Sequence, residues 1–332
     1  MKILVTGCAG MIGTQFSELL MKSGISVVGC DNFARGTKEN LHYLEQLSES
    51  NEVSFEFHEL DLINGLPQNL LKGVDTVVHL ADVVGGIMYV FDNQLDVFNL
   101  SVTIDANVVR AVANSNVKKY IYAGTACSFP QELQNSTDSM LYEKDKFPAH
   151  PESAYGWGKL VGELQTTYLN ESKMASTVGA NVIFHNVYGP WCDFDLNTCQ
   201  VIPALIRKAS ALSGDQSLEV WGGGDQARSF INSYDISKFL LKMVTSESSL
   251  RAFNGVQLGS EYGTTINDLA KLILKEAGKD INAITHINPN FRGDIGRIPD
   301  LSLARKLGFN QEIDIHKGIK SLFQWAKTHD KI

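Results

Sequence analysis

The sequence predicts an α/β fold in which helices cover both faces of a parallel sheet, with a smaller domain at the C-terminal end. Strand-like apolar runs alternate with helical apolar spacing to about residue 190. A glycine-rich turn joins the first strand-like run to the first helix-like segment. From residue 191 the elements become shorter and are separated by glycine turns. We therefore divide the chain into residues 1–190 and 191–332.

The first strand and helix carry a dinucleotide-binding pattern. Residues 3–6 form a β-branched apolar run, glycines follow with GxxGxxG spacing, and helical apolar spacing comes next. In such a turn the glycines permit a tight bend, close approach of a pyrophosphate, and packing of helix on strand, and the helix N-terminus binds the anion. This predicts a Rossmann-type fold. The turn residues expected at the cofactor are Gly7, Gly10, Met11, Ile12 and Gly13.

The second strand-like run, residues 25–30, ends at Asp31 and Asn32. An acidic residue about 20 positions beyond the glycines suits a ribose 2′-hydroxyl and would repel a 2′-phosphate. This predicts NAD as the cofactor. Arg35 and Lys38 lie nearby in sequence and weigh the other way, and a simple turn role for Asp31 is the alternative.

Two further strands are expected to end at the cofactor. After the run 53–57, Asp61 and Leu62 are candidates for contact with the adenine. The run 76–81 ends in Leu80 and Ala81, which we place beside the cofactor. The histidine of that run, His79, is interpreted as a core residue rather than a catalyst.

The helix expected after residue 152 carries Tyr155 and Lys159. Residues four apart lie on one helix face. A lysine ammonium next to a phenol favours the phenolate, so this spacing predicts a base for oxidation of an alcohol beside a nicotinamide. An exposed helix with an unrelated tyrosine and lysine is the alternative.

These motifs resemble the extended short-chain dehydrogenases/reductases of the NAD-dependent epimerase/dehydratase kind, from residue 1 to about 325. Further matching segments are His79–Ala81, Asn186–Pro190, Trp221–Phe230 and Arg297–Asp300. The resemblance implies a nucleotide-sugar substrate, Thr125 as the hydrogen-bonding partner of Tyr155, and a small domain interleaved with the large one. It also implies a homodimer formed by helices 94–115 and 153–172.

The apolar stripe on the first of these helices has two interpretations. It could face a partner subunit, or it could belong to the protein's own core. Its members are Leu95, Phe98, Val102, Ala106, Val109 and Ala113.

The residues after Thr125 distinguish branches of the family. Dehydratases carry Asp-Glu there, whereas this chain has Ala126 and Cys127. The cysteine, followed three residues later by Pro130, resembles GDP-mannose 3,5-epimerases and GDP-fucose synthases, which implies that Cys127 moves protons beside a ketone. The glycine pair ending at Gly86 resembles the same two branches. A small residue packing under the nicotinamide is the alternative role for Cys127.

The second proton-transfer group of both branches is either missing or supplied by another residue. Residues 191–206 contain no lysine, where the epimerases have one, and Gln200 stands where the synthases have a histidine. Titrating residues that remain are Asp193, Asp195, Cys199 and His185, and the sequence does not choose among them.

The net charge of −8 argues against nucleic-acid and anionic-membrane partners. A phosphate-bearing substrate then needs a local basic cluster. Candidates for it are Arg207, Lys208, Arg228, Arg292 and Arg297. The resemblance adds Gly86 and Asn186 as substrate-binding residues.

Other features bear on location. No run of about 18 apolar residues is present, and a strand expected from residue 3 leaves no room for a signal peptide. Five cysteines without disulfide-like spacing suit a reducing cytoplasm, and no cysteine or histidine cluster suggests a metal.

The sequence thus predicts an NAD-dependent nucleotide-sugar epimerase that acts at C3 and/or C5 of a GDP-hexose or related GDP-sugar through a transient 4-ketone. A GDP-4-keto-sugar epimerase/reductase and a nucleotide-sugar 4-epimerase remain as alternatives. A cofactor-binding regulatory relative without catalysis is the alternative of another class.

Overall fold

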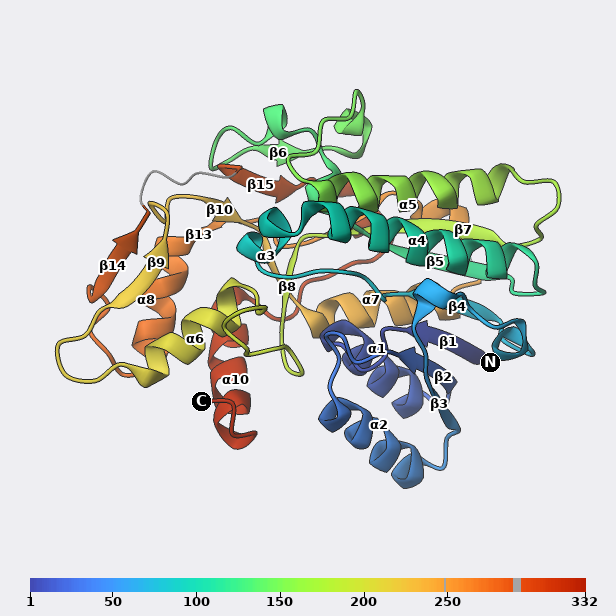
Figure 1. Cartoon of the computed structure of the whole chain (residues 1–332), viewed down its shortest axis with the longest axis horizontal. Coiled ribbons are helices and arrows are strands. Elements are labelled where there is room, and N and C mark those ends of the chain that lie inside the picture. Colours follow the sequence, from blue (N-terminus) through green and yellow to red (C-terminus); the bar gives the residue numbers. More distant parts are fainter. Residues whose placement is uncertain (248, 289–293) are drawn as a thin grey trace.

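The computed structural model describes residues 1–247, 249–288 and 294–332. Its largest feature is a seven-stranded sheet in the order β3-β2-β1-β4-β5-β7-β12, with every pair of neighbours parallel (Figure 1). Its strands are β1 (Lys2–Thr6), β2 (Ser26–Asp31), β3 (Phe55–Glu59), β4 (Thr76–His79), β5 (Lys119–Thr125), β7 (Val178–Phe184) and β12 (Val256–Leu258). The doubly wound, Rossmann-type α/β fold is confirmed.

Each face of this sheet is covered by its own helices. In β1, Ile3 and Val5 point into a core shared with α1, α2 and α7, while Leu4 points into a second core shared with α4 and α5. Both cores are lined by buried β-branched and aromatic residues, as expected for strands covered on two faces. These helices are α1 (Met11–Lys22), α2 (Lys38–Asn51), α4 (Gln94–Ala113), α5 (Ala154–Glu171) and α7 (Ser233–Thr245).

The strand order reverses beside β1, because β2 and β3 lie on one side of it and β4 and β5 on the other. In open parallel sheets, ligands bind outside the carboxyl ends of the strands at such a point. The short helix α3 (Ile87–Asp92) follows β4 at this end of the sheet.

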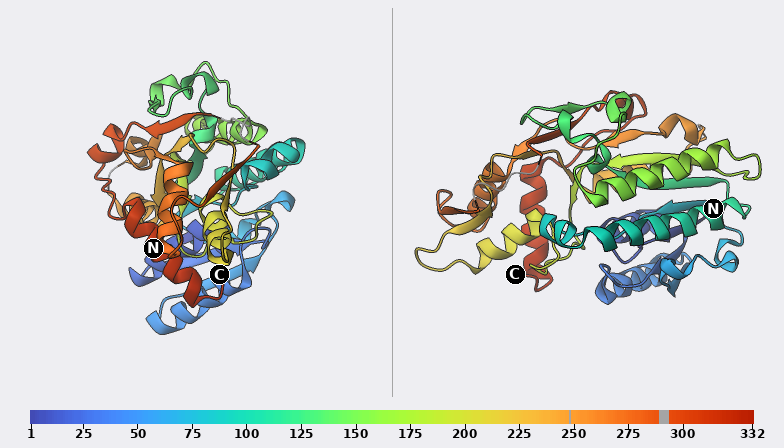
Figure 2. Two further views of the ribbon diagram at one scale, coloured as in Figure 1. Left: turned by 90° about the vertical axis from the view of Figure 1, so that its left-hand side faces the viewer. Right: turned by 45° about the horizontal axis from the view of Figure 1, so that its top comes forward.

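The smaller part of the molecule holds short sheets and a helical cluster. A four-stranded sheet runs β13-β10-β15-β6, and the pairs β8–β11 and β9–β14 complete it. Helices α6, α8 and α10 pack around a shared core (Figure 2). The elements are β6 (Met140–Leu141), β8 (Asn186–Tyr188), β9 (Leu218–Trp221), β10 (Ala227–Arg228), β11 (Phe230–Asn232), β13 (Thr264–Thr265), β14 (Ile284–Ile287), β15 (Gly296–Pro299), α6 (Val201–Ala211), α8 (Ile266–Glu276), α9 (Ser302–Lys306) and α10 (Ile315–Thr328).

The chain passes between the two parts more than once. Strand β12 comes from the C-terminal half and pairs with β7 at the edge of the large sheet. Strand β6 comes from the N-terminal half and pairs with β15. A division at residue 190 stays a prediction, and the strand pairings cross it in both directions.

Helices α4 and α5 lie side by side on one face of the sheet (Figure 1). The apolar stripe that the sequence shows on α4 belongs to the core only in part, because Val109 and Ala113 pack against the second core. Leu95 is 74% exposed and the other five members are partly exposed, whereas α4 buries a different set that includes Val97, Ile104 and Val108. The core-only interpretation of the stripe is therefore wrong.

Among the residues that the structure describes, no helix combines the length and apolar character needed to cross a membrane.

Candidate active site

The glycine turn has the geometry that a bound pyrophosphate requires. Gly7 adopts φ 68°, and a Cβ on Gly13 would lie 2.0 Å from the Gly7 carbonyl oxygen, so a larger residue would collide with the turn. Gly10 caps α1 without a side-chain hydrogen bond. The first-turn amides, including those of Met11 and Ile12, are thus available to an anion. The donor set fits a dinucleotide.

Asp31 ends β2 beside this turn. Its carboxylate accepts hydrogen bonds from the Ala9 amide at 3.0 Å and the Phe33 amide at 2.8 Å. Burial raises the pKa of Asp31, while these amides act in the opposite direction. The neighbouring Asn32 side chain accepts from the Ala34 amide in a turn. Asp31 therefore lies at the position where an acid was expected to bind the ribose 2′-hydroxyl. Both of its carboxylate oxygens already accept hydrogen bonds from main-chain amides.

The two cations that lie near Asp31 in sequence, Arg35 and Lys38, contact other groups. Arg35 donates to the Thr198 carbonyl at 2.8 Å and pairs with Asp193 at 3.4 Å. Lys38 lies 5.9 Å from the centre of the Phe33 ring. Neither contact places a cation on Asp31.

The ends of the next two strands lie close to the glycine turn. The amides of Leu80 and Ala81 both donate to Thr6 Oγ1 at 3.1 Å. A Cβ on Gly7 would lie 2.9 Å from the Ala81 nitrogen, so this loop and the turn are in direct contact. Asp61 caps the 3₁₀ turn 62–64 by accepting a hydrogen bond from the Ile63 amide at 3.0 Å. Leu62, the first residue of that turn, is buried.

His79 is a core residue, as expected. It is 1% exposed and hydrogen-bonds with Thr6 at 2.6 Å and with Asp105 at 3.0 Å. Tyr122 donates to the same carboxylate at 2.5 Å. Both ring nitrogens are occupied, so the histidine holds β4 to β1 and α4.

Tyr155 and Lys159 share the first two turns of α5, which Ser153 caps. Thr125, at the end of β5, hydrogen-bonds with Tyr155. The Lys159 ammonium is 3% exposed and lies 3.4 Å from Asp82 Oδ2 and 4.3 Å from the centre of the Tyr122 ring. The structure brings the expected trio together and adds a carboxylate to it.

The expected lowering of the Tyr155 pKa is a point on which the sequence was misleading. Burial raises the pKa of Tyr155 well above its usual value, and the charges of Asp82 and Cys127 add to this effect. The hydrogen bond from Thr125 acts the other way.

Cys127 lies in the short 3₁₀ turn Ala126–Ser128, directly after Thr125. Its amide donates to Thr125 Oγ1 at 3.2 Å, and Arg297 Nη1 lies 2.9 Å from its sulfur. Arg297 also donates to Gln134 and to Asp294. Burial alone would lower the pKa of Arg297, but Cys127 and Asp294 raise it above its usual value, so the guanidinium stays charged.

A second arginine joins this group through strand pairing. Arg228 of β10 is registered with Arg297 of β15 and donates to the Asp294 carbonyl at 2.8 Å. Burial lowers the pKa of Arg228 to about 10. Glu152 hydrogen-bonds with Asp294, and burial together with that like charge raises the pKa of Glu152 to about 7. Two acids and two arginines thus lie in one cluster beside Cys127.

The remaining substrate candidates are spread out. Arg207 on α6 donates to the Phe194 carbonyl at 2.7 Å, and Lys208 lies 3.7 Å from Glu219. Asn186 is the first residue of β8, and its main-chain amide donates to the Ser229 carbonyl at 3.0 Å. Arg292 lies outside the described residues. Among the described candidates, Arg228 and Arg297 lie together, in the group that also holds Asp294 and Glu152.

Gly86 lies where the loop after β4 meets the loop after β8. Its amide donates to the Thr198 carbonyl at 3.2 Å, and a Cβ would lie 2.9 Å from the Cys199 carbonyl oxygen. The expected glycine is therefore needed for close approach of these two loops.

The four candidates for a second proton-transfer group differ in environment. Burial lowers the pKa of His185 to about 3, so its ring is neutral at physiological pH. Burial raises the pKa of Cys199 to about 11. Asp193 is occupied by Arg35, and Asp195 is exposed and accepts from Asn197. These environments favour none of them.

Sequence reasoning missed three acids of the site: Asp82, Glu152 and Asp294. Asp82 directly follows the strand-end motif, so an acid at the carboxyl end of a central strand was the available signal. Glu152 precedes the helix cap by one residue. Nothing in the sequence signals Asp294, because its place depends on the pairing of β10 with β15.

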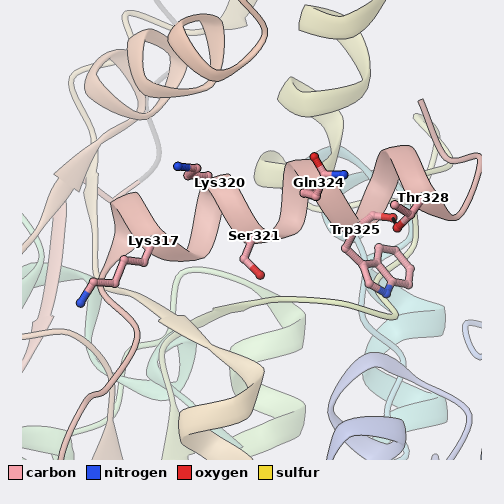
Figure 3. Close-up of a pocket in the computed structure, with 6 residues that line it drawn as sticks. All are labelled: Lys317, Lys320, Ser321, Gln324, Trp325 and Thr328. Atoms are coloured by element: carbon pink, nitrogen blue, oxygen red, sulfur yellow. Dashed lines mark hydrogen bonds between the residues drawn. The ribbon is translucent and has the colours of Figure 1, made fainter.

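A hollow on the surface of α10 lies away from these residues (Figure 3). It is lined only by side chains of that helix: Lys317, Lys320, Ser321, Gln324, Trp325 and Thr328. No group of three or more histidine, cysteine, aspartate or glutamate side chains suited to a metal occurs in the described part of the chain.

A family model supports the assignment suggested by this geometry. Residues 3–259 match the model described as "NAD dependent epimerase/dehydratase family". The chain belongs to this family. Members of this family are NAD-dependent, as the description of the model states.

Relatives in this family include sugar-nucleotide enzymes. The chain is 30% identical over 332 residues to GDP-mannose 3,5-epimerase 1 of Oryza sativa subsp. japonica, covering 98% of this chain and 82% of the relative. It is 28% identical over 255 residues to GDP-L-fucose synthase of Dictyostelium discoideum, covering 75% and 77% of the two chains.

Solved structures of two nucleotide-sugar epimerases have the same fold. UDP-glucose 4-epimerase of Thermotoga maritima, crystallised with UDP-glucose, superposes with a TM-score of 0.83 at 21% identity and 99% coverage of both chains. UDP-glucuronic acid 4-epimerase of Bacillus cereus, in complex with UDP-glucuronic acid and NAD, gives 0.82 at 22% identity, covering 99% of this chain and 100% of that one.

Proposed function

We propose that this protein is an NAD-dependent nucleotide-sugar epimerase that inverts C3 and/or C5 of a GDP-hexose through a transient 4-ketone. The observation that carries the proposal is the contact of Arg297 with Cys127, beside Thr125 and Tyr155. A guanidinium next to a sulfur is the environment in which a thiolate forms and moves protons. Tyr155, the proposed base for oxidation at C4, thus lies near Cys127, the proposed base that removes a proton from carbon.

Bound NAD supplies the hydride acceptor and donor. Tyr155 takes the proton of the sugar 4-hydroxyl as phenolate, the form that the charge of Lys159 favours against the effect of burial, and Thr125 holds the oxygen by a hydrogen bond. The resulting ketone acidifies the C–H bonds at C3 and C5. Cys127 removes one of these protons. Reprotonation of the carbon from its other face, by a proton that exchanges with solvent, inverts the centre before hydride returns to C4. Arg228 and Arg297 are the proposed cations for the diphosphate, with Arg207, Asn186 and Gly86 as further contacts.

The proposal also includes a guanine base, a homodimer and a cytoplasmic location. GDP is favoured because the relatives at 30% and 28% identity are named as GDP-sugar enzymes. The proposed homodimer is supported by the outward apolar residues of α4 and α5. Thiol-form cysteines are consistent with a reducing cytoplasm.

A nucleotide-sugar 4-epimerase is the second candidate. It needs no second proton-transfer group, and the environments of Asp193, Asp195, Cys199 and His185 point to none. A 4-keto-sugar reductase would consume reduced cofactor. A regulatory relative without catalysis is disfavoured because Tyr155, Lys159 and Thr125 are all present, with Thr125 beside Tyr155 and Lys159 paired with Asp82 next to them.

Isotope exchange decides between these functions. We expect the enzyme with NAD, incubated with GDP-hexoses in heavy water, to place deuterium at C3 or C5 of recovered sugar. The Cys127→Ser variant should lose this exchange while still reducing enzyme-bound NAD on addition of the sugar. Full retention of both protons together with inversion at C4 would establish the 4-epimerase instead.

The nucleotide is tested separately by binding. We expect thermal-shift measurements against GDP-, UDP-, dTDP- and CDP-sugars to show the largest stabilisation with GDP-sugars. A preference for another base would contradict the GDP assignment and leave the isotope result standing.

A further inference from the structure

Gln134 is a buried residue whose side-chain amide joins the Cys127 turn to Arg297. It is 1% exposed. Its Nε2 donates to the Phe129 carbonyl and to the Pro130 carbonyl, both at 3.2 Å, and its Oε1 accepts from Arg297 Nε. A side-chain amide has two N–H donors and one acceptor oxygen, so each polar atom of this side chain has a partner. One residue thus connects the main chain after the cysteine with the arginine.

The main chain of Gln134 is bonded to the same segment as the arginine. Its carbonyl accepts from the Ile295 amide at 2.7 Å and from the Gly296 amide at 3.2 Å, and these two residues directly precede Arg297. A Cβ on Gly296 would lie 1.7 Å from the Ser136 carbonyl oxygen, so the chain after Gln134 runs in close contact with β15. The amide therefore reaches the arginine from a fixed main-chain position.

The guanidinium of Arg297 places three nitrogens on three partners. Nε donates to Gln134, Nη1 lies 2.9 Å from the Cys127 sulfur, and Nη2 donates to Asp294. The group is planar and rigid, so holding two of its nitrogens determines where the third one points. Nη1 is therefore directed at the sulfur because Gln134 holds Nε and Asp294 holds Nη2.

The turn that carries Cys127 is also attached to α5, independently of Gln134. The Ser128 hydroxyl, which is fully buried, lies 2.9 Å from Glu163 Oε1. Glu163 is in turn paired with the buried Lys146 at 2.5 Å. Without Gln134 the turn should keep its place on α5, and the arginine should be the part that moves.

We propose that Gln134 is a positioning residue that directs the Arg297 guanidinium at the sulfur of Cys127. The inference rests on the proposed function, in which Cys127 removes a proton from carbon beside the 4-ketone. In that step the C–H bond breaks, its electron pair passes into the ketone to give an enolate, and the proton moves to the sulfur. The step starts from a thiolate, and a cation held beside the sulfur favours that form.

The first test needs neither sugar nor turnover. It measures the rate at which iodoacetamide alkylates Cys127, followed by mass spectrometry of the peptide that contains it. The rate at about pH 7 is divided by the rate at about pH 9.5, where an ordinary thiol is mostly ionised. This ratio removes the effect of reagent access and reports how far the surroundings favour the thiolate. In Gln134→Met, which nearly keeps the side-chain volume, the ratio should be several-fold lower than in the wild type.

Gln257→Met is the matched control. Gln257 is a second fully buried glutamine, which donates to the Leu141 carbonyl at 2.8 Å and whose Oε1 lies 3.1 Å from His185 Nε2. The hydrogen bonds lost in this variant belong to Leu141 and His185 rather than to Arg297. The alkylation ratio should therefore stay at the wild-type value even where the protein is less stable. An unchanged ratio in folded Gln134→Met would overturn the proposal.

A substitution at the arginine tests whether Gln134 acts through it. Arg297→Lys keeps a positive charge but loses the planar fork, so it should also lower the ratio. Adding Gln134→Met to Arg297→Lys should lower the ratio no further, since both changes remove one interaction. Effects that add in full on a logarithmic scale would contradict the proposal. If Gln134→Met does not fold, Arg297→Lys decides alone, because an unchanged ratio there contradicts a directed guanidinium.

The second test separates the two halves of the proposed reaction. In heavy water with NAD and the sugar, Gln134→Met should incorporate deuterium at C3 or C5 several-fold more slowly than the wild type. Reduction of enzyme-bound NAD by the sugar should keep nearly the wild-type rate, because Tyr155 and Thr125 are held by α5 and β5. Equal losses in both rates would indicate a merely structural role and contradict the proposal. If no nucleotide sugar is turned over, the proposed function fails, while the alkylation ratio still tests Gln134.

Discussion

Glu152, Asp294, Arg228 and Arg297 behave as one unit, because each has its partner within the group. Asp294 is the shared acceptor. Its carboxylate contacts Arg297 and Glu152, and its carbonyl accepts from Arg228. The state of this group sets the charge near Cys127, so proton uptake by Glu152 is expected to influence both stability and activity.

The first prediction concerns the pH dependence of stability. The pKa of Glu152 rises from 4.5 to about 7 on folding, so the folded protein binds more protons than the unfolded chain between these values. The contribution of Glu152 to stability is therefore present below pH 4.5 and is lost as the pH rises through about 7. Glu152→Gln should gain Tm over the wild type as the pH rises from about 5 to about 8.

The control is Glu49→Gln, an exposed glutamate on α2. Its Tm should follow that of the wild type at each pH. If the Tm of the wild type and that of Glu152→Gln change in parallel with pH, the raised pKa of Glu152 is contradicted.

A second prediction compares two arginines. Arg297→Met removes the buried donor to Asp294, Gln134 and Cys127 and leaves the Asp294 charge unpaired. The expected loss in free energy of unfolding is about 3–5 kcal/mol. Arg305→Met breaks an exposed pair with Glu261 and should cost less than about 1 kcal/mol. Denaturant titration measures both, and equal losses would contradict the assigned burial.

At the scale of elements, helix α5 is fixed tightly against the site by its glycines. A Cβ on Gly156 would lie 2.2 Å from the Cys127 carbonyl oxygen, and one on Gly162 would lie 2.1 Å from the Tyr122 hydroxyl. At Gly158 the nearest atom would be 3.5 Å away, an ordinary contact. The helix can therefore tolerate a larger residue at one of these glycines and not at the others.

The third prediction uses that difference within one helix. Gly158→Ala should leave stability unchanged or raise it by up to about 1 kcal/mol, because alanine is the better helix former. Gly162→Ala should lower it, because the methyl group displaces Tyr122 from its bond with Asp105. Thermal unfolding of the two variants checks the order, and the reverse order would contradict this packing.

For the whole molecule, the outer surface of α4 and α5 is the notable apolar face. Leu95 on α4 and Trp157 and Tyr168 on α5 are exposed, at 74%, 39% and 64%. Exposed apolar patches of this kind mark interaction surfaces. Since both helices belong to one face of the sheet, a second copy of the chain can cover them together by two-fold symmetry.

The fourth prediction tests this face. Val102→Asp, in the middle of the α4 stripe, should convert a dimer into a monomer in light scattering coupled to size exclusion. Gln324→Asp makes the same change in charge on the exposed side of α10 (Figure 3) and should leave the dimer intact. A monomeric wild type would contradict the proposed assembly.

Sequence patterns over short stretches predicted those parts of the protein that depend on neighbouring residues in the chain. The sheet, the glycine turn and the helix carrying Tyr155 all follow from spacing within about 20 residues. The contacts that set the charge of the site do not. Asp82, in the loop after β4, pairs with Lys159 on α5, and Arg228 meets Asp294 only because β10 pairs with β15.

The direction of the Tyr155 pKa shows the same limit. The sequence reveals that a lysine is one turn away, but it does not reveal which other charge neutralises that lysine. The α4 stripe is similar, since helical spacing identifies an apolar face without saying whether the protein's own core or a second chain covers it.

The crossing of strands between the two parts restricts how this protein can be rebuilt. A fragment ending at residue 190 would lack β12, and β7 would become a bare edge open to pairing with other chains. It would also carry β6 without its neighbour β15. A chimera that takes a new sugar specificity from a relative must therefore exchange several separate segments together, and a single splice point would yield an insoluble product.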